Sequence, residues 1–289
     1  MSIITTNQAI NTGTVMYGVF GDPISHSKSP LMLNRAFQET KLNAAYAAFH
    51  VLPGKLKLAI DGVRAMNFRG VNVTIPHKVE VMAYLDEIDE GARAIGAVNT
   101  IVNENGKLIG YNTDGIGFVR SMKEETGVSI AGKRILMLGA GGAARGIAYA
   151  LAKEGAAMIW ITNRTADKAV KLAESLGEFT KVEAIAADQL AGIMEQVDII
   201  VNNTSIGMFP KVEGIPIDPE LLHANLLVSD IVYTPRITRL LKEAQTKGAQ
   251  IHSGFGMFIY QGAYAFEYWT GLPAPVHAMR EVVIQSLGE

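Results

Sequence analysis

A glycine-rich turn near the middle of the chain has the residue types and spacing of a phosphate-binding site. The turn Gly139-Ala140-Gly141-Gly142-Ala143 follows an apolar run, residues 135–138, that suits a buried parallel strand. Gly139 permits a tight turn, Gly141 lets a pyrophosphate approach the backbone at a helix N-terminus, and Ala144 allows close helix–strand packing. A glycine triplet alone is weak evidence, but its place between a predicted strand and a predicted helix favours a dinucleotide site.

The residues that follow the second predicted strand indicate which dinucleotide binds. An NAD site usually carries Asp or Glu there, about 20 residues after the glycines, to bind the ribose 2′-hydroxyl. This chain has Asn163, Arg164 and Thr165 instead, with Lys168 one helical turn later. A carboxylate would repel a 2′-phosphate, whereas a guanidinium can donate two charge-assisted hydrogen bonds to it. The sequence therefore predicts NADP in preference to NAD; the alternative is a plain tight turn with a solvated arginine.

A lysine at the end of residues 71–78 (V-N-V-T-I-P-H-K) is a candidate for proton transfer. Pro76 fits the first position of a helix, which would place Lys78 in the first turn, where the helix dipole disfavours a cation. A lysine at a positive helix end should titrate more easily than a free one, which suits proton transfer. The alternative is a flexible surface lysine, and His77 is interpreted as a surface residue without a role.

An aspartate in the segment Y-N-T-D-G is the candidate partner of this lysine. Asp114 stands at a predicted helix start, where aspartate is a favoured N-cap. If Thr113 caps the helix instead, the carboxylate is left for chemistry. The functional interpretation requires Asp114 to face Lys78, which spacing along the chain does not decide.

Four further polar segments suit ligand binding. The loop 21–30 (G-D-P-I-S-H-S-K-S-P) presents hydroxyls and amides near a helix N-terminus, where a carboxylate would be held, although Ser29 would also serve as a plain N-cap. The loop after residue 202 (N-T-S-I-G-M) follows a strand of the second domain and should face its crevice. The other two are residues 96–100 (G-A-V-N-T) and residues 253–257 (S-G-F-G-M), with Gln261 two turns into the helix that starts at the latter.

Composition limits the class of protein. The chain has 289 residues, which is long enough for two domains; 48% are hydrophobic, the net charge is −2 and there is no cysteine. Disulfides, cysteine-ligated zinc and thiol catalysis are excluded, and no cluster of metal ligands or nucleic-acid-binding charge is evident. No apolar run reaches the roughly 18 residues of a membrane span, and residues 1–12 lack the features of a signal peptide. We expect a cytoplasmic protein with a polar extension at its start.

Two α/β domains must position these segments. The first has predicted strands at 14–20, 44–51, 70–74, 97–103 and 107–111, the last two joined by the turn pair Asn105-Gly106, and helices at 30–40, 55–66, from Pro76 and at 86–95. The second is a doubly wound, mostly parallel sheet, with helices at 114–125, 143–153, 166–176, 188–195 and 236–247 and strands at 135–138, 158–162, 182–185, 198–202 and 226–232. Residues 255–289 are predicted to be helical and to pack back on the first domain. We therefore expect a substrate domain of residues 1–113 with 254–289, and a cofactor domain of residues 114–253.

Taken in order, these segments resemble the shikimate dehydrogenase family. The resemblance runs from residue 21 to about 262 and is carried by the motifs S-H-S-K-S-P, V-N-V-T-I-P-H-K, G-A-V-N-T, N-T-D-G, G-A-G-G-A-A-R, N-R-T, N-T-S-I-G-M, D-I-V-Y-T-P and G-M-F-I-Y-Q-G. It implies a Rossmann-type NADP domain, reversible NADPH-dependent reduction of 3-dehydroshikimate to shikimate in aromatic amino-acid biosynthesis, and a monomer or homodimer.

The resemblance also implies a role for individual residues. Lys78 and Asp114 would be the catalytic pair. The substrate carboxylate would be held by Ser27, Ser29 and Tyr233, and its ring hydroxyls by Thr74, Asn99 and Gln261, with Asn72 nearby. The cofactor pyrophosphate would lie on residues 139–143 and its 2′-phosphate end on residues 163–168. Thr204 would also contact the cofactor, and Ile231, Gly254 and Met257 would line its nicotinamide side.

Two departures and two alternatives accompany this interpretation. Lys168 stands where many relatives carry a second arginine, which would weaken the phosphate site and allow some use of NAD, and the first 13 residues have no family role. A quinate/shikimate dehydrogenase of broader range is the near alternative; relatives preferring quinate tend to have threonine near Ser29, so serine favours shikimate. A non-catalytic NADP-binding regulator would be expected to lack Lys78 and Asp114, which are both present.

Overall fold

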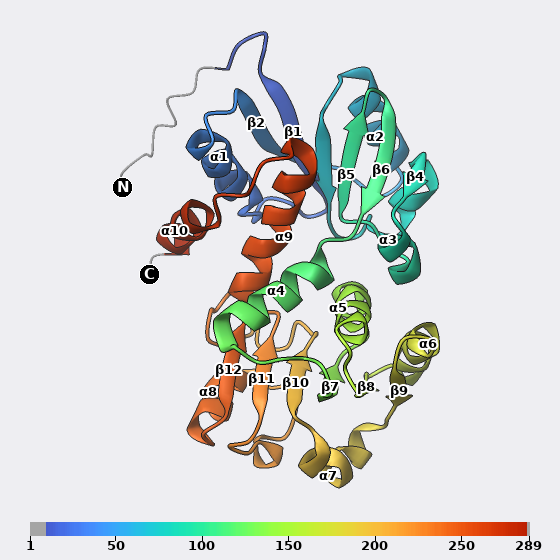
Figure 1. Ribbon diagram of the computed structural model, residues 1–289, viewed down its shortest axis with the longest axis vertical. Helices are drawn as coiled ribbons and strands as arrows, with labels where there is room; N and C mark the ends of the chain where they lie inside the picture. The colour runs from blue at the N-terminus through green and yellow to red at the C-terminus, as the bar shows by residue number, and fades with distance from the viewer. Residues whose placement is uncertain (1–9, 288–289) are drawn as a thin grey trace. The chain divides into compact units, whose positions relative to one another are not determined.

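The computed structural model describes residues 10–287, which form two compact units (Figure 1). Of the described residues, 10–113 with 262–287 form the first unit, and Asp114–Gln261 form the second. Whereas the sequence places the return to the first domain at residue 254, the units divide at Gly262, within a helix. Most of the expected N-terminal extension, residues 1–9, lies outside the described residues.

The first unit contains a mixed six-stranded sheet in the order β2-β1-β3-β5-β6-β4. Its first three strands are parallel, and β5 and β6 form an antiparallel hairpin. The strands are β1 Val15–Gly21, β2 Ala44–His50, β3 Gly70–Val73, β4 Glu87–Ile88, β5 Thr100–Glu104 and β6 Lys107–Tyr111. The helices are α1 Ser29–Glu39, α2 Leu56–Ala65, the 3₁₀ helix η1 Glu80–Tyr84 and α3 Glu90–Ile95.

Local sequence explains two elements of this unit. Asn105 and Gly106 both have positive φ, 54° and 97°, which is the backbone that a tight hairpin turn requires. Helix α2 buries Leu56, Ile60 and Val63, whose spacing places them on one face against the sheet. The expected hairpin and the expected helix at 55–66 are therefore confirmed.

One predicted helix of the first unit is wrong, and a second is confirmed only from Glu90 onward. No helix opens at Pro76: residues 75–79 form turns, and η1 begins only at Glu80. Within the predicted helix 86–95, the amide of Asp86 donates to the Leu108 carbonyl and the chain adds strand β4 beside β6. Helix α3 then starts after Asp89, whose carboxylate caps it by accepting from two backbone amides. Bonds to distant segments outweigh the helical pattern at both places.

The second unit is a six-stranded sheet in the order β12-β11-β10-β7-β8-β9, with every pair parallel. The strands are β7 Arg134–Leu138, β8 Met158–Thr162, β9 Lys181–Ala184, β10 Ile199–Asn202, β11 Leu227–Asp230 and β12 Gln250–Ser253. The helices are α4 Asp114–Thr126, α5 Gly142–Lys153, α6 Ala166–Leu176, α7 Leu190–Ile193 and α8 Arg239–Thr246, with 3₁₀ helices η2 Ala187–Gln189, η3 Met194–Gln196 and η4 Pro219–Leu221.

Both faces of this sheet are covered, which explains its continuous apolar strands. Along β7, Ile135 and Met137 join a core shared with α4, α5 and α6, whereas Leu136 and Leu138 join a second core shared with α7 and α8. The doubly wound architecture is thus confirmed. The edge strand β12 was not expected, because it has only four residues, of which His252 alone is buried, and they carry little apolar pattern. The predicted helix 188–195 is broken into η2, α7 and η3.

The C-terminal helices return to the first unit as expected. Helix α9, Gly254–Thr270, is followed by α10, Val276–Leu287, which packs on α1. The indole of Trp269 donates to the Ile101 carbonyl at 2.9 Å, and a Cβ on Gly70 would lie 2.1 Å from the indole nitrogen, so only glycine fits there. No helix among residues 10–287 is long and apolar enough to span a membrane.

Candidate active site

In the first unit, the loops that follow β1, β2 and β3 are bonded to one another. The Asp22 amide donates to the Ile75 carbonyl at 3.0 Å, and the Asp22 carboxylate lies 2.6 Å from Nε2 of His50. His77 Nε2 donates to the carbonyl of Val51 at 2.6 Å. These loops carry the serines and the lysine that the sequence singles out, so the bonds hold the candidate substrate residues in one framework.

Lys78 lies in a turn rather than in a helix, so the helix-dipole argument for its chemistry is wrong. Its carbonyl accepts from the Val98 amide at 2.8 Å, and its side chain is half-buried. The neighbouring His77 is fully buried, which corrects its interpretation as a surface residue. Lys78 therefore owes its position to main-chain bonds and to a buried histidine anchor beside it.

Ser27 closes a turn ahead of α1, and Ser29 is the first residue of that helix and not its N-cap. The N-cap position belongs to Lys28, whose side chain makes no capping bond, and the Ser29 amide donates to Ser27 Oγ at 3.3 Å. Neither serine hydroxyl donates a hydrogen bond to another group in the part of the chain that the structure describes. A Cβ on Gly21 would lie 2.5 Å from the Thr74 methyl, so glycine lets the two loops approach.

A buried network of amides and hydroxyls holds Asn72 and Asn99. Asn72 Nδ2 donates to the Asn99 carbonyl and to Thr100 Oγ1, and its Oδ1 accepts from the Tyr46 hydroxyl at 2.7 Å. Asn99 Oδ1 accepts from the Thr113 amide at 2.8 Å, and its Nδ2 donates to Thr113 Oγ1 at 3.0 Å. Both donors of the Asn72 amide are engaged, which favours a positioning role for that residue.

Asp114 is the first residue of α4, following Thr113, and is only 5% exposed. The N-cap interpretation therefore does not describe it. Gly115, the next residue, allows α4 to cross α5 closely, because a Cβ there would lie 2.0 Å from the Gly146 carbonyl oxygen. That Asp114 faces Lys78 stays a prediction.

The glycine turn of the second unit has the expected strand–turn–helix context. Gly139 has φ of 101°, and a Cβ on it would lie 2.8 Å from the Thr204 methyl. Gly141 is the N-cap of α5, and a Cβ on Gly141 or Gly142 would meet nothing within 4 Å. The protein's own packing does not require glycine at these two positions. The open space and the helix N-terminus fit a pyrophosphate.

The end of β8 combines a structural asparagine with an exposed arginine. Asn163 Oδ1 accepts from the Ala140 amide at 3.1 Å, and its Nδ2 donates to the Thr165 carbonyl at 2.9 Å. The side chains of Arg164 and Lys168 are exposed and make no hydrogen bond or ion pair with the residues that the structure describes. Asn163 thus joins the glycine turn to the loop after β8, and the side chains of Arg164 and Lys168 are accessible to an anion.

Asp230, a residue to which the sequence assigned no role, organises the loops after β10 and β11. It is fully buried; Oδ1 accepts from Asn202 Nδ2 and from the Val232 amide, both at 3.0 Å, and Oδ2 accepts from the Thr238 hydroxyl at 2.7 Å. Burial raises the pKa of Asp230, and these hydrogen bonds partly offset the rise. Asn202 Oδ1 in turn accepts from the amide and the hydroxyl of Thr204.

The remaining candidates of the second unit gather where β11 ends and α9 begins. A Cβ on Gly254 would lie 2.1 Å from the Ile231 carbonyl oxygen, and Met257 joins the same apolar core as Ile231. The Tyr233 ring stacks on Phe258, with centroids 5.0 Å apart, and burial raises the pKa of Tyr233. Gln261, two turns into α9, donates to the Phe258 carbonyl at 2.9 Å.

Comparisons with known proteins agree with this architecture. Three family models match: the shikimate dehydrogenase substrate binding domain at residues 19–101, shikimate/quinate 5-dehydrogenase at 121–209, and the shikimate 5′-dehydrogenase C-terminal domain at 254–284. A shikimate dehydrogenase (NADP(+)) of Geobacillus sp. (strain WCH70) is 50% identical, over 94% of this chain and 98% of that protein. The chain belongs to the shikimate dehydrogenase family. No group of three or more His, Asp or Glu side chains placed to hold a metal ion occurs among residues 10–287.

Solved shikimate dehydrogenases share the fold. One in complex with NADP⁺ is 46% identical, with a TM-score of 0.90 and coverage of 96% of this chain and 97% of that one. The enzyme of Listeria monocytogenes, in complex with shikimate and NAD, is 40% identical, with a TM-score of 0.90 and coverage of 95% and 98%. A quinate dehydrogenase of Corynebacterium glutamicum, in complex with NAD, is also similar, at 31% identity and a TM-score of 0.89 over 94% and 99%.

Proposed function

We propose that this chain is an NADP-dependent shikimate dehydrogenase that interconverts 3-dehydroshikimate and shikimate in aromatic amino-acid biosynthesis. The observation that carries the proposal is the way Lys78 is held. It is a half-buried lysine fixed by main-chain bonds and by the His77 anchor, in a loop bonded to the serine loop. The extent of the match to relatives that are NADP-dependent shikimate dehydrogenases supports it.

The residues of the second unit fit NADP. The open space at Gly141 and Gly142 suits the pyrophosphate. The exposed side chains of Arg164 and Lys168 suit the 2′-phosphate. The hydrogen bonds of Asn163, to the Ala140 amide and the Thr165 carbonyl, shape the loop between these two places. We assign Ala140 and Ala143 to the pyrophosphate, and Thr204, Ile231, Gly254 and Met257 to the remainder of the cofactor. When bound, the reduced cofactor supplies the hydride.

The protein's part in the reaction is to bind, orient and protonate. As the ketone is reduced, negative charge grows on its oxygen; the Lys78 ammonium stabilises that charge and donates the proton. A carboxylate beside a lysine favours its charged form and orients it, which is the role we assign to Asp114. Ser27, Ser29 and Tyr233 would hold the substrate carboxylate, and Thr74, Asn99 and Gln261 its hydroxyls, with Asn72 positioning Asn99.

In this proposal, substrate binding belongs to residues 1–113 with 254–289 and cofactor binding to residues 114–253. We also propose a cytoplasmic enzyme whose partner is the small-molecule substrate and not a nucleic acid.

The test is steady-state reduction of NADP⁺ with shikimate and with quinate, each repeated with NAD⁺. Turnover confined to shikimate with NADP⁺ is the expected result. Comparable rates with quinate or NAD⁺ would move the chain to the broader quinate/shikimate class, a candidate favoured by its similarity to the quinate dehydrogenase. Binding of NADPH without turnover of either substrate would favour the non-catalytic regulator.

A further inference from the structure

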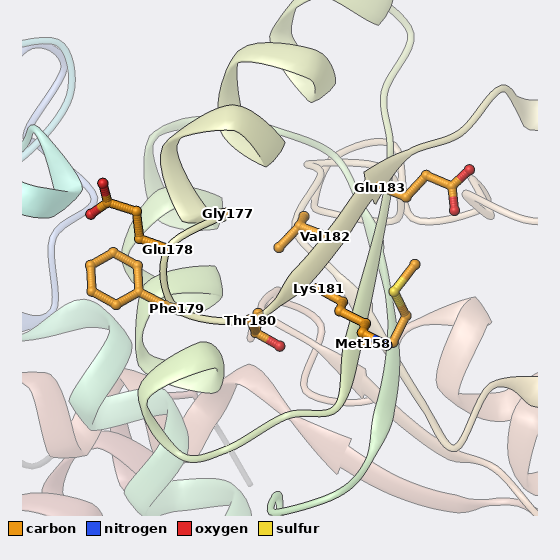
Figure 2. Close-up of a pocket in the computed structure, with 8 residues that line it drawn as sticks. All are labelled: Met158, Gly177, Glu178, Phe179, Thr180, Lys181, Val182 and Glu183. Carbon is orange, nitrogen blue, oxygen red and sulfur yellow. The ribbon is translucent and has the colours of Figure 1, made fainter.

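One edge of the second unit's sheet is open along β9. Strand β9 pairs with β8 alone, and a hollow beside it is lined by Met158 and residues 177–183 (Figure 2). Phe179, at the rim of this hollow, is 37% exposed. An exposed strand edge presents main-chain donors and acceptors on which another strand can add.

The pairing with β8 decides which main-chain groups face outward. The Ile185 amide donates to the Ile161 carbonyl, so Ile185 faces β8. Because residues of a parallel strand alternate in the side to which their N–H and C=O groups point, Lys181 and Glu183 also face β8. The amides and carbonyls of Val182 and Ala184 therefore point away from the sheet.

The chain blocks a comparable edge at one residue in its first unit. On β2, Asn34 Nδ2 donates to the Tyr46 carbonyl at 2.8 Å, and the Tyr46 amide donates to Asn34 Oδ1 at 2.9 Å. That side chain occupies the place of a further strand. On β9, no side chain within the described residues bonds the outward groups of Val182 or Ala184, so this edge lacks such protection.

We propose that a second copy of this chain pairs with β9 as an antiparallel strand, about a two-fold axis at Val182. In this register the two Val182 residues exchange main-chain hydrogen bonds, because their outward groups meet. Lys181 of one copy then lies directly opposite Glu183 of the other, twice, and each pair joins opposite charges. A two-fold axis at Lys181 or at Glu183 would instead place like charges opposite each other.

The dimer is expected to form reversibly with rising concentration, because a four-residue strand is a small interface compared with those of stable dimers. Sedimentation velocity over a concentration series measures it. Glu183→Lys and Lys181→Glu should each weaken association by about tenfold or more, since each creates like-charge pairs. The double variant carrying both changes restores opposite charges and should associate like the natural chain. This double variant separates the proposed register from a general effect of charge.

Two further variants complete the test. Val182→Pro removes an outward amide that β8 does not use, so the fold should persist, checked by its thermal melt, while dimerisation is lost. Glu195→Lys makes the same charge change at an exposed position away from β9 and should leave association unchanged. A natural chain that stays monomeric up to millimolar concentration would overturn the proposal. So would a dimer that survives Val182→Pro, or a double variant that fails to regain association.

Discussion

Replacing Arg164 by glutamine removes the cation that we assign to the 2′-phosphate and leaves the surrounding turn intact. The Arg164 side chain is exposed and makes no bond within the described residues, so the fold should not depend on it. A hydrogen bond to a charged group contributes about 1.5–3 kcal/mol. Because solvent screens an exposed pair, we expect the lower part of that range, about 1.5–2 kcal/mol. This corresponds to a loss of about 10- to 30-fold in binding.

The assay compares kcat/KM for NADP⁺ and for NAD⁺ at fixed low salt. Arg164→Gln should lower the value for NADP⁺ by about 10- to 30-fold, mainly through KM, and leave that for NAD⁺ near the natural chain's. Lys168→Gln is the matched control and should cost less, since a lysine offers a point charge without a planar fork. Equal losses with both cofactors would indicate a disturbed turn. An unchanged value for NADP⁺ would refute the assignment.

Three other expectations follow from the site. Lys78→Ala should lose most of kcat while NADPH affinity, measured by fluorescence titration, stays near that of the natural chain; an active variant would contradict the catalytic assignment. Burial raises the pKa of Asp230, so its contribution to the free energy of unfolding should be present at low pH and be lost as the pH rises from the ordinary aspartate pKa through the raised one. Denaturant unfolding should therefore show a flatter dependence of stability on pH for Asp230→Asn than for the natural chain. The same pH dependence in both proteins would contradict this expectation. Gly254→Ala should lower the free energy of unfolding by about 1–3 kcal/mol, because the added Cβ meets the Ile231 carbonyl. Gly142→Ala adds its Cβ in open space, so this variant should keep the thermal stability of the natural chain and bind NADPH more weakly. Equal melting temperatures for the two alanine variants would contradict this account.

Elements with a strong local pattern were predictable to the residue. Strand β8 and helix α6 have the expected bounds, because an apolar run and a regular helical face are read from neighbouring residues alone. The turn at Gly139 was predictable for the same reason, since its φ of 101° is open to glycine and strained for other residues.

The failures share one physical cause, which is bonding between residues far apart in the chain. The helix expected from Pro76 is replaced by turns that include a buried His77, whose ring donates to the carbonyl of Val51. Asp230 received no role because its partner Asn202 lies 28 positions earlier, and no local spacing links the two.

The sequence by itself determined the order of the elements, the glycine turn, the choice of a cation over a carboxylate at Arg164, and the family resemblance. Each of these depends on residue type and short-range spacing, which the printed chain contains in full. Only the tertiary structure decided that Lys78 lies in a turn, that Asn72 is engaged by a buried network, and that the edge of β9 is open while that of β2 is blocked at Tyr46. Those outcomes depend on which distant donors and acceptors meet, and on which remain unpaired, after the sheets have assembled.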